Sequence, residues 1–386
     1  MTLLPLVIGL LGVQAPTPVI VPFHVAENAI LVDGKVNGHT VTMLFDSGFG
    51  GTVLLSSAID IGPATGSMHL RDFVGELEAN TVDLKSLSIG GEALAPDEKI
   101  IVQQPGNFTA SYGHHCDGIL GLGAVKDKVV EIDFEHNQFK FYPAGYDITK
   151  TPVDGKKTFL SKLLPIGGNA MEMAVTTDKG QTMTMALDTG NAFYATSHKD
   201  VLERVGVWDD SKVPSYVRRS GVASGPVDSW YKKMPPLTIF GIPVQPTVWD
   251  IIDLPSSDVR GDGTVGFGFL SNFNITFDYS RRRVLFENWK TPIENEAPGD
   301  LGISARYDPE QKKTLVVLVS PGSPADTAGI KEDDEILSIG SNDMVRPTYQ
   351  QLRAWFEGAV GSTCVVSISR DGALKRFNLT RQALVN

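Results

Sequence analysis

Cysteine is scarce in this sequence. Only Cys116 and Cys364 occur among its 386 residues, and neither belongs to a CxxC or CxxH motif. A disulfide framework needs several paired cysteines, and a zinc ribbon needs clustered ones. The sequence therefore excludes both classes, and the protein must be stabilised by ordinary hydrophobic cores.

Positive charge is also in short supply. The chain has 34 Lys and Arg against 45 Asp and Glu, which gives a net charge of −11. Binding to phosphate backbones or anionic lipid surfaces needs clustered positive charge, so we expect no nucleic-acid partner. With 42% hydrophobic and 20% charged residues, the composition is that of a globular protein rather than a disordered one.

An apolar run long enough to span a membrane is lacking. The apolar start, residues 3–13, is shorter than the roughly 20 residues that cross a bilayer. It is followed by a proline-rich stretch, a pattern that resembles a secretory signal peptide, although no Lys or Arg precedes it. We therefore expect an exported protein, periplasmic or secreted, with residues 1–21 as leader and membrane contact only if the leader is retained. The alternative is a buried N-terminal strand.

Several catalytic signatures are missing as well. The sequence contains no GxSxG, HExxH or P-loop motif, so serine hydrolase, zincin and NTPase activities lack support. The adjacent His114 and His115 would point to opposite faces of a strand, which keeps them from sharing a metal ion. We expect neither a metal site nor a bound cofactor.

The sequence does contain an internal repeat. Residues 38–48 read GHTVTMLFDSG and residues 180–190 read GQTMTMALDTG. Further on, CDGILGLG at 116–123 corresponds to GDGTVGFG at 261–268. The first pair alternates in hydrophobicity as half-buried strands do, so each Asp is expected to end a strand and enter a tight turn.

The repeat extends beyond these motifs. Residues 131–143 and 274–288 each read as an alternating strand, a polar turn and a second alternating strand. Duplication of one unit is the economical interpretation. It predicts two β lobes, at residues 22–150 and 151–290.

The repeat places Asp46 and Asp188 at matched positions in Asp-Ser/Thr-Gly turns. A pseudo-two-fold axis between the lobes would bring both carboxylates to one water. Like charges so close cannot both ionise easily, so the pair would share one proton. One carboxylate could then take a proton from the water while the other donates to a peptide carbonyl oxygen. Four neighbours are expected to shape this site through hydroxyl bonds between the loops and close backbone approach: Ser47, Gly48, Thr189 and Gly190.

The two lobes resemble the pepsin and retropepsin group of aspartic endopeptidases. Their Asp-Ser/Thr-Gly turns match the catalytic turns of that group, and residues 117–121 and 262–266 match its hydrophobic-hydrophobic-Gly element. The resemblance implies a mainly β fold with two lobes related by pseudo-two-fold symmetry, in which Gly121 and Gly266 lie beneath the catalytic loops. It also implies cleavage of extended polypeptide substrates.

The sequence departs from this family at two places. The family has Ser, Thr or Ala after the catalytic Gly, whereas this chain has Phe49 and Asn191. Asn191 can still bond near its carboxylate, whereas Phe49 can only fill a pocket. Pepsins also carry a flap tyrosine, but residues 66–77, where spacing places the flap, contain Phe73 and no Tyr. We therefore expect a shorter, retropepsin-like flap that uses backbone contacts.

The last part of the chain has a different pattern. Residues 291–299 are charged and contain proline, which is typical of a linker. Residues 300–386 resemble bacterial PDZ domains, with Leu301-Gly302-Ile303-Ser304 as the peptide-carboxylate loop and residues 322–330 as the first helix region. The resemblance implies that this loop binds a substrate tail or the C-terminal peptide of a partner.

Periodicity within this last domain predicts its elements. Helical spacing of apolar residues extends over residues 348–356. Strand-like segments are expected at 302–305, 314–319, 334–339 and 363–369.

The hypothesis is an exported, monomeric aspartic endopeptidase with a trailing PDZ-like domain. The alternative is a catalytically inactive protease-like scaffold that binds peptides through its PDZ-like domain, because Phe49 and the missing flap tyrosine weaken the likeness to active enzymes.

Overall fold

The computed structural model describes most of the chain. The described residues are 17–71, 76–94, 99–103, 114–165, 170–222, 225–254, 256, 261–290 and 297–385. Three features expected from the sequence lie outside them: the apolar start, Phe73 of the expected flap, and residues 291–296 of the expected linker. No helix in the described part of the chain is long and apolar enough to cross a membrane.

The first lobe is built on a mixed ten-stranded sheet in the order β6-β7-β10-β5-β11-β4-β3-β8-β9, with β2 paired to β3. Strand β11 runs parallel to β4, and β10 runs parallel to β5. The alternating residues 38–48 supply β4, which ends at Asp46 as expected. The strands are β2 (His24–Ala26), β3 (Ala29–Val36), β4 (His39–Asp46), β5 (Val53–Ser56), β6 (Gly66–Arg71), β7 (Glu76–Asp83), β8 (Leu87–Ile89), β9 (Glu92–Ala93), β10 (Lys99–Gln103) and β11 (Gly118–Gly121).

The second lobe repeats this sheet in the order β18-β19-β22-β17-β23-β16-β15-β20-β21. The parallel pairs recur as β16 with β23 and β17 with β22. Its strands are β15 (Glu172–Thr177), β16 (Thr182–Leu187), β17 (Ala195–His198), β18 (Val217–Val222), β19 (Gly225–Lys233), β20 (Leu237–Ile239), β21 (Ile242–Val244), β22 (Val248–Ile252) and β23 (Gly263–Val265). Each strand has a counterpart in the first sheet, β18 matching β6 at one end and β21 matching β9 at the other. The duplication expected from the sequence is therefore confirmed.

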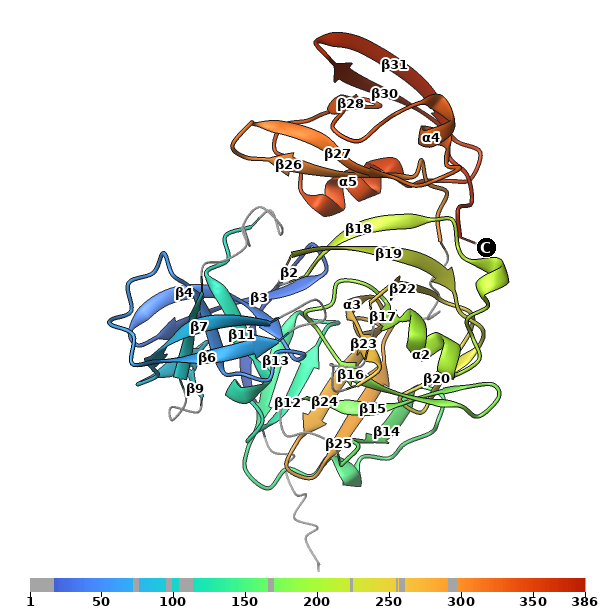
Figure 1. The fold of residues 1–386 in the computed structure, drawn as a ribbon. Helices are drawn as coiled ribbons and strands as arrows, with labels where there is room; N and C mark the ends of the chain where they lie inside the picture. Colours follow the sequence, from blue (N-terminus) through green and yellow to red (C-terminus); the bar gives the residue numbers. More distant parts are fainter. Residues whose placement is uncertain are drawn as a thin grey trace, which may run out of the picture.

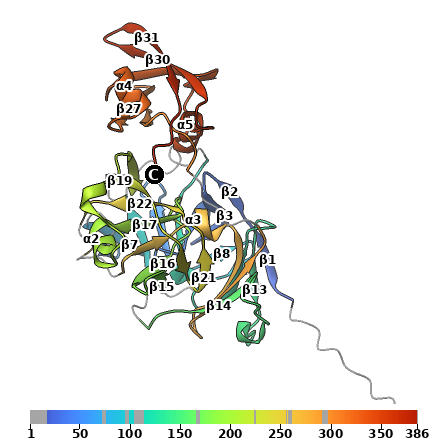
Figure 2. The ribbon, with the colours of Figure 1, turned by 90° about the vertical axis from the view of Figure 1, so that its right-hand side faces the viewer.

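A third sheet joins the lobes along one side of the molecule (Figures 1 and 2). Its order is β1-β13-β12-β24-β25-β14, and its central pair takes β12 from one copy of the repeat and β24 from the other. The strands are β1 (Val19–Pro22), β12 (Val129–Asp133), β13 (Gln138–Tyr142), β14 (Thr158–Lys162), β24 (Phe273–Asp278) and β25 (Arg283–Asn288). Side chains of both lobes form one hydrophobic core, so the two lobes are a single packed unit.

Strand β1 occupies one edge of this third sheet, with Val21 opposite Phe139. Both side chains are buried. The strand starts at Val19, so the boundary expected for the leader, residue 21, lies inside a strand of the folded lobe. Helices are short here: α2 (Lys199–Arg204), α3 (Phe267–Leu270), and the 3₁₀ turns η1 (Leu122–Ala124), η2 (Ile148–Lys150) and η3 (Asp210–Lys212).

The last domain is an antiparallel sheet in the order β26-β27-β28-β30-β31, with β29 paired to β28. It has its own hydrophobic core. Its elements are β26 (Ile303–Asp308), β27 (Lys313–Val319), α4 (Pro324–Ala328), β28 (Glu335–Ile339), β29 (Asn342–Asp343), α5 (Tyr349–Phe356), β30 (Thr363–Arg370) and β31 (Ala373–Thr380). The expected strands and helix are all present, and β31 is an addition that the sequence pattern did not predict.

Capping side chains fix both helices of this domain. The Ser323 hydroxyl accepts the Asp326 N–H at the start of α4. Thr348 and Gln351 form a reciprocal capping box at the start of α5. The domain rests on β18 of the second lobe, which contacts β26 and β27 (Figure 1).

Candidate active site

The two Asp-Ser/Thr-Gly turns hold their own carboxylates in the same way. Oδ1 of Asp46 accepts the N–H of Gly48 at 2.8 Å and that of Phe49 at 3.0 Å. Oδ1 of Asp188 accepts the N–H of Gly190 at 2.9 Å and that of Asn191 at 3.1 Å. Each strand therefore delivers its carboxylate to a turn whose backbone fixes one oxygen.

Two hydroxyl side chains tie these turns together. The Ser47 Oγ accepts the Thr189 N–H at 3.0 Å and donates to the Leu187 carbonyl at 2.9 Å. Reciprocally, the Thr189 Oγ1 accepts the Ser47 N–H at 3.0 Å and donates to the Phe45 carbonyl at 2.9 Å. Both residues are fully buried, with 0% exposure. Four bonds related by the pseudo-two-fold axis thus fix the distance between the two carboxylates.

The glycines of the turns allow the carboxylates to meet. A Cβ added at Gly48 would lie 2.5 Å from Cγ of Asp188, and one at Gly190 would lie 2.4 Å from Cγ of Asp46. No side chain could occupy either place. The two Asp side chains are consequently hydrogen-bonded to each other.

The two carboxyl groups differ in proton affinity. Burial raises the pKa of Asp188 well above its ordinary value, and the neighbouring charge of Asp46 raises it further. Burial also raises the pKa of Asp46, but hydrogen bonds from Asp188 and from the N–H groups of its own turn oppose that rise. The two carboxyls therefore titrate as a coupled pair that shares one proton.

The glycines of the second repeated motif lie under the catalytic loops. A Cβ at Gly121 would come within 2.2 Å of the Gly51 carbonyl oxygen, and one at Gly266 within 2.4 Å of the Phe193 carbonyl oxygen. The structure thus places both glycines where the family resemblance put them. Only a residue without a side chain lets the strand cross so close beneath the loop.

Phe49 and Asn191 both turn away from the carboxylates. The Phe49 ring packs against a small apolar cluster that includes Leu54 and Ile101. The Asn191 amide donates to the hydroxyls of Thr196 at 3.0 Å and Thr264 at 2.7 Å. The Asn191 side chain therefore secures its loop to β17 and β23, while the Asn191 backbone N–H bonds to the Asp188 carboxylate.

Two further carboxylates fix the strands that lead into the Asp-Ser/Thr-Gly turns. The sequence pattern had not assigned a role to either of them. Oδ2 of Asp117 accepts the N–H of Thr42 at 2.9 Å, and Oδ2 of Asp262 accepts the N–H of Thr184 at 2.7 Å. The acceptors hold β4 and β16 in register just before the turns. Their matched places in the repeated DGxxG motif were the signal that could have identified them.

The hairpins at the ends of the two lobe sheets have different surroundings. Strands β6 and β7 form the hairpin where the flap was expected, and the turn between them lies outside the described residues. Strands β18 and β19 form the matching hairpin of the second lobe, and the last domain packs against it. The pseudo-symmetry of the lobes is therefore broken at this end.

The residues expected to bind a peptide carboxylate are buried in this structure. Leu301 is 0% exposed, Ile303 2% and Ser304 5%. The Gly302 N–H already donates to Oδ1 of Asp300 at 2.6 Å. The four residues that the PDZ resemblance assigned to ligand binding thus form one loop. One backbone donor of this loop, the Gly302 N–H, is already bonded to the Asp300 carboxylate of the same chain.

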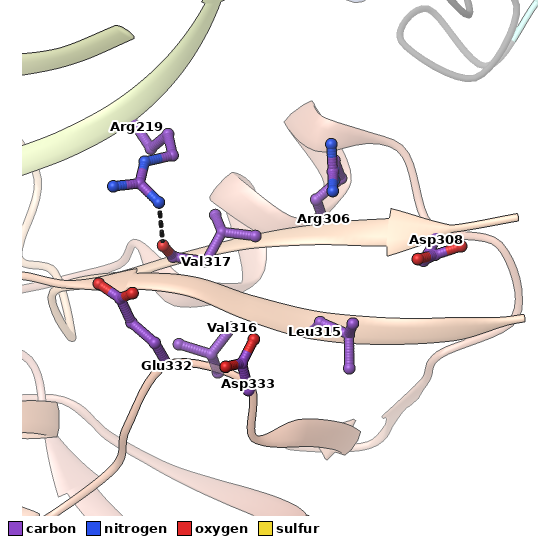
Figure 3. A pocket seen from close by; sticks show the side chains of 8 residues that line it. All are labelled: Arg219, Arg306, Asp308, Leu315, Val316, Val317, Glu332 and Asp333. Carbon is purple, nitrogen blue, oxygen red and sulfur yellow. Dashed lines mark hydrogen bonds between the residues drawn. The ribbon is translucent and has the colours of Figure 1, made fainter. Parts of the chain in front are cut away.

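Two hollows lie in or beside the last domain. A crevice of about 140 Å³ lies where β18 meets β26 and β27; Arg219 lines it and donates to the Val317 carbonyl at 2.7 Å (Figure 3). A wider hollow of about 450 Å³ is lined by residues of β28, α5 and β30. Neither contains catalytic carboxylates.

One cluster among the described residues has the composition of a metal site: Asp133, Glu135 and His136. Its buried carboxylate, Asp133, is already paired with the Lys140 ammonium at 2.8 Å and accepts from Gln138 at 2.8 Å. A lysine charge occupies the place of a cation, so the cluster is an ion-pair network.

Comparison with known proteins gives similarities of three kinds. Residues 315–370 match the family model described as PDZ domain. A carboxyl-terminal-processing protease from Picosynechococcus is 28% identical over 101 residues, which are 26% of this chain and 24% of that protein, so the chain aligns with about a quarter of its relative.

The third similarity is structural. The aspartic proteinase from Irpex lacteus shares 14% identity and a TM-score of 0.43, over 72% of this chain and 100% of that one. The likeness of the two lobes to pepsin-like lobes rests on their matched sheets and on the two Asp-Ser/Thr-Gly turns with their reciprocal hydroxyl bonds, and not on this superposition. On those features, the chain joins two β lobes resembling those of pepsin-like aspartic proteases to a C-terminal PDZ domain.

Proposed function

We propose that the protein is an aspartic endopeptidase that cleaves extended polypeptides with a water activated between Asp46 and Asp188. The observation that carries this proposal is the direct contact of the two carboxyl groups, each fixed by its own turn and by the hydroxyls of Ser47 and Thr189. Burying two carboxyl groups costs desolvation free energy, so ordinary turns would not be expected to hold such a pair in contact.

The asymmetry of the pair assigns the roles. The Asp46 carboxylate would take a proton from the water as its oxygen attacks the carbonyl carbon, and Asp188 would donate its proton to the carbonyl oxygen. In the tetrahedral intermediate, Asp46 then passes the proton that it took from the water to the amide nitrogen as the C–N bond breaks. Asp188 regains its proton from a hydroxyl of the intermediate. No metal or cofactor is needed to balance this reaction.

Substrate would bind as an added strand between the lobes, with backbone hydrogen bonds giving affinity and side-chain pockets giving specificity. The PDZ domain would hold a substrate tail or the C-terminal peptide of a partner and raise the local concentration of substrate. We further propose that the protein works outside the cytoplasm, since the apolar start resembles a signal peptide.

The test measures cleavage of a quenched fluorescent peptide library by the parent, Asp46→Asn and Asp188→Asn. We expect each variant to lose activity by about 100-fold or more, because a general acid or base contributes 10²–10⁴-fold. Asp178→Asn is the matched control, since Asp178 is exposed in the turn between β15 and β16. Unchanged cleavage in either dyad variant would remove the assignment.

The second candidate function is a catalytically inactive scaffold that binds peptides. It is favoured by the identity of Phe49 and Asn191, because neither side chain supplies a hydroxyl to support the dyad and both are engaged elsewhere. If purified parent protein cleaves nothing in the library while still binding peptides, this function replaces the first.

A further inference from the structure

The β18–β19 hairpin docks on the PDZ domain through backbone groups. The Val217 N–H donates to the Ser320 hydroxyl at 3.0 Å, and the Arg219 N–H donates to the Ser304 hydroxyl at 3.3 Å. The Ser320 hydroxyl in turn donates to the Ser215 carbonyl at 3.1 Å. Hydroxyls of the PDZ domain thus satisfy the outer edge of β18, directly beside the carboxylate loop.

Between these contacts, the Arg218 side chain reaches into the domain boundary. It is 3% exposed, and its guanidinium lies 2.6 Å from Oδ2 of Asp300, whose side chain is equally buried. Oδ1 of Asp300 accepts the Gly302 N–H at 2.6 Å. The Asp300 carboxylate therefore accepts from a backbone N–H of the carboxylate loop and also pairs with the Arg218 guanidinium beside that loop.

The same hairpin also contacts α5, which packs beside β26. The Arg218 guanidinium is 3.5 Å from the Glu357 carboxylate, just after the end of the helix. One turn earlier, the Arg353 guanidinium lies 6.0 Å from the centre of the Tyr231 ring of β19. The hairpin thus contacts both the end of α5 and β26, the edge strand to which a peptide would add.

We propose that the Arg218–Asp300 pair is a latch that closes the PDZ groove, and that a peptide with a free C-terminal carboxylate opens it by taking the place of the Asp300 carboxylate. The inference rests on the proposed peptide-binding role of the PDZ domain and adds its regulation. It identifies Arg218, a residue of the second lobe, as part of the PDZ ligand site.

The chemistry of the contact suits a reversible latch. The donors that hold Asp300, a backbone N–H and a guanidinium, are those that bind any carboxylate. Burying two charges costs desolvation energy that offsets much of their attraction, so a competing ligand does not face a strongly favoured pair. Opening would release the hairpin that corresponds to the flap hairpin of the first lobe, which links the ligand to the protease lobes.

The test compares fluorescein-labelled peptides ending in valine, with either a free carboxylate or an amide, by fluorescence anisotropy on the full chain. We expect Asp300→Asn to bind the free-acid peptide about tenfold or more tightly than the parent does, because the competing carboxylate is removed while the Arg218 guanidinium and the Gly302 N–H remain as donors. Binding of the amidated peptide should remain weak. Asp371→Asn is the matched control, since Asp371 is exposed in the turn between β30 and β31.

A second variant guards against misfolding of Asp300→Asn. Replacing Ser304 and Ser320 together by alanine loosens the hairpin without leaving a buried charge, and it should also tighten free-acid binding. If the parent binds the free-acid peptide as tightly as a folded latch variant, the latch is wrong although the peptide-binding role stands. If the parent and all folded variants bind neither peptide, the peptide-binding role and the latch both fall. Neither result depends on the dyad, so each is distinct from a failure of the protease proposal.

Discussion

At the level of single residues, the dyad is held more by backbone than by side chains. Each Asp receives two N–H bonds from its own turn, and the residues after the catalytic glycines, Phe49 and Asn191, are engaged elsewhere. Burial then dominates the proton affinity of Asp188. Burial of the site is therefore the main reason why the two carboxyls share one proton.

This balance predicts a bell-shaped dependence of kcat/KM on pH. As pH falls through the pKa of Asp46, both carboxyls become neutral and the base is lost; as pH rises through the raised pKa of Asp188, both ionise and the acid is lost. The alkaline limb should lie well above the ordinary pKa of an aspartate. The measurement is kcat/KM for one peptide from about pH 3 to about pH 9, with Asp178→Asn expected to reproduce the parent curve. A rate that rises steadily to the alkaline end would contradict the shared proton.

At the level of elements, β4 and β16 owe their common geometry to matched contacts at their ends. Asp117 and Asp262 fix the strands by their backbone N–H groups, and the crossed hydroxyls of Ser47 and Thr189 fix the turns that follow. These matched contacts keep the carboxylates of the two lobes together.

Replacing Thr189 by valine should weaken this connection. The change keeps the shape but removes the acceptor for the Ser47 N–H and the donor to the Phe45 carbonyl, so buried polar groups lose their partners. We expect a loss of about 1–3 kcal/mol in the free energy of unfolding, measured with urea, together with reduced cleavage. Thr189→Ser should restore most of both. The control is Thr182→Val at an exposed site on β16, where a loss of similar size would show that the hydroxyl contact is not the cause.

The elements also show how far the sequence pattern carries. Alternating hydrophobicity correctly predicted β4, β12, β13, β24 and β25 and the main strands of the PDZ domain, because burial of one face is written into neighbouring residues. The orientation of Asn191 could not be predicted, since it depends on Thr264, which lies 73 positions away in the sequence.

At the level of the whole molecule, the chain forms two units with different internal links. The lobes share one hydrophobic core and a sheet whose central pair combines both copies of the repeat. The PDZ domain has a separate core and meets the lobes through polar groups, the Arg218–Asp300 pair and a small apolar cluster in which Leu384 and Val385 pack against the second lobe. Such a boundary permits relative motion of the domains.

This arrangement predicts that the two lobes unfold together and the PDZ domain unfolds separately in differential scanning calorimetry. Leu352→Ala, in the PDZ core, should lower only one transition, and Phe277→Ala, in the shared sheet, should lower only the other. Each change should cost about 2–5 kcal/mol in the unit that contains it. If either variant shifts both transitions equally, the two units are one cooperative body.

By itself, the sequence determined the duplication, the pair Asp46 and Asp188, and the PDZ character of the last domain. Those features are local patterns, repeated or spaced along the chain, so they can be predicted from the known preferences of strands and turns. Only the tertiary structure decided that both carboxyls are buried and that their pKa values are raised, because burial and contact between segments set those values. It also decided that Arg218 meets Asp300 at the carboxylate loop, since a contact between residues 82 positions apart depends on how two folded domains pack.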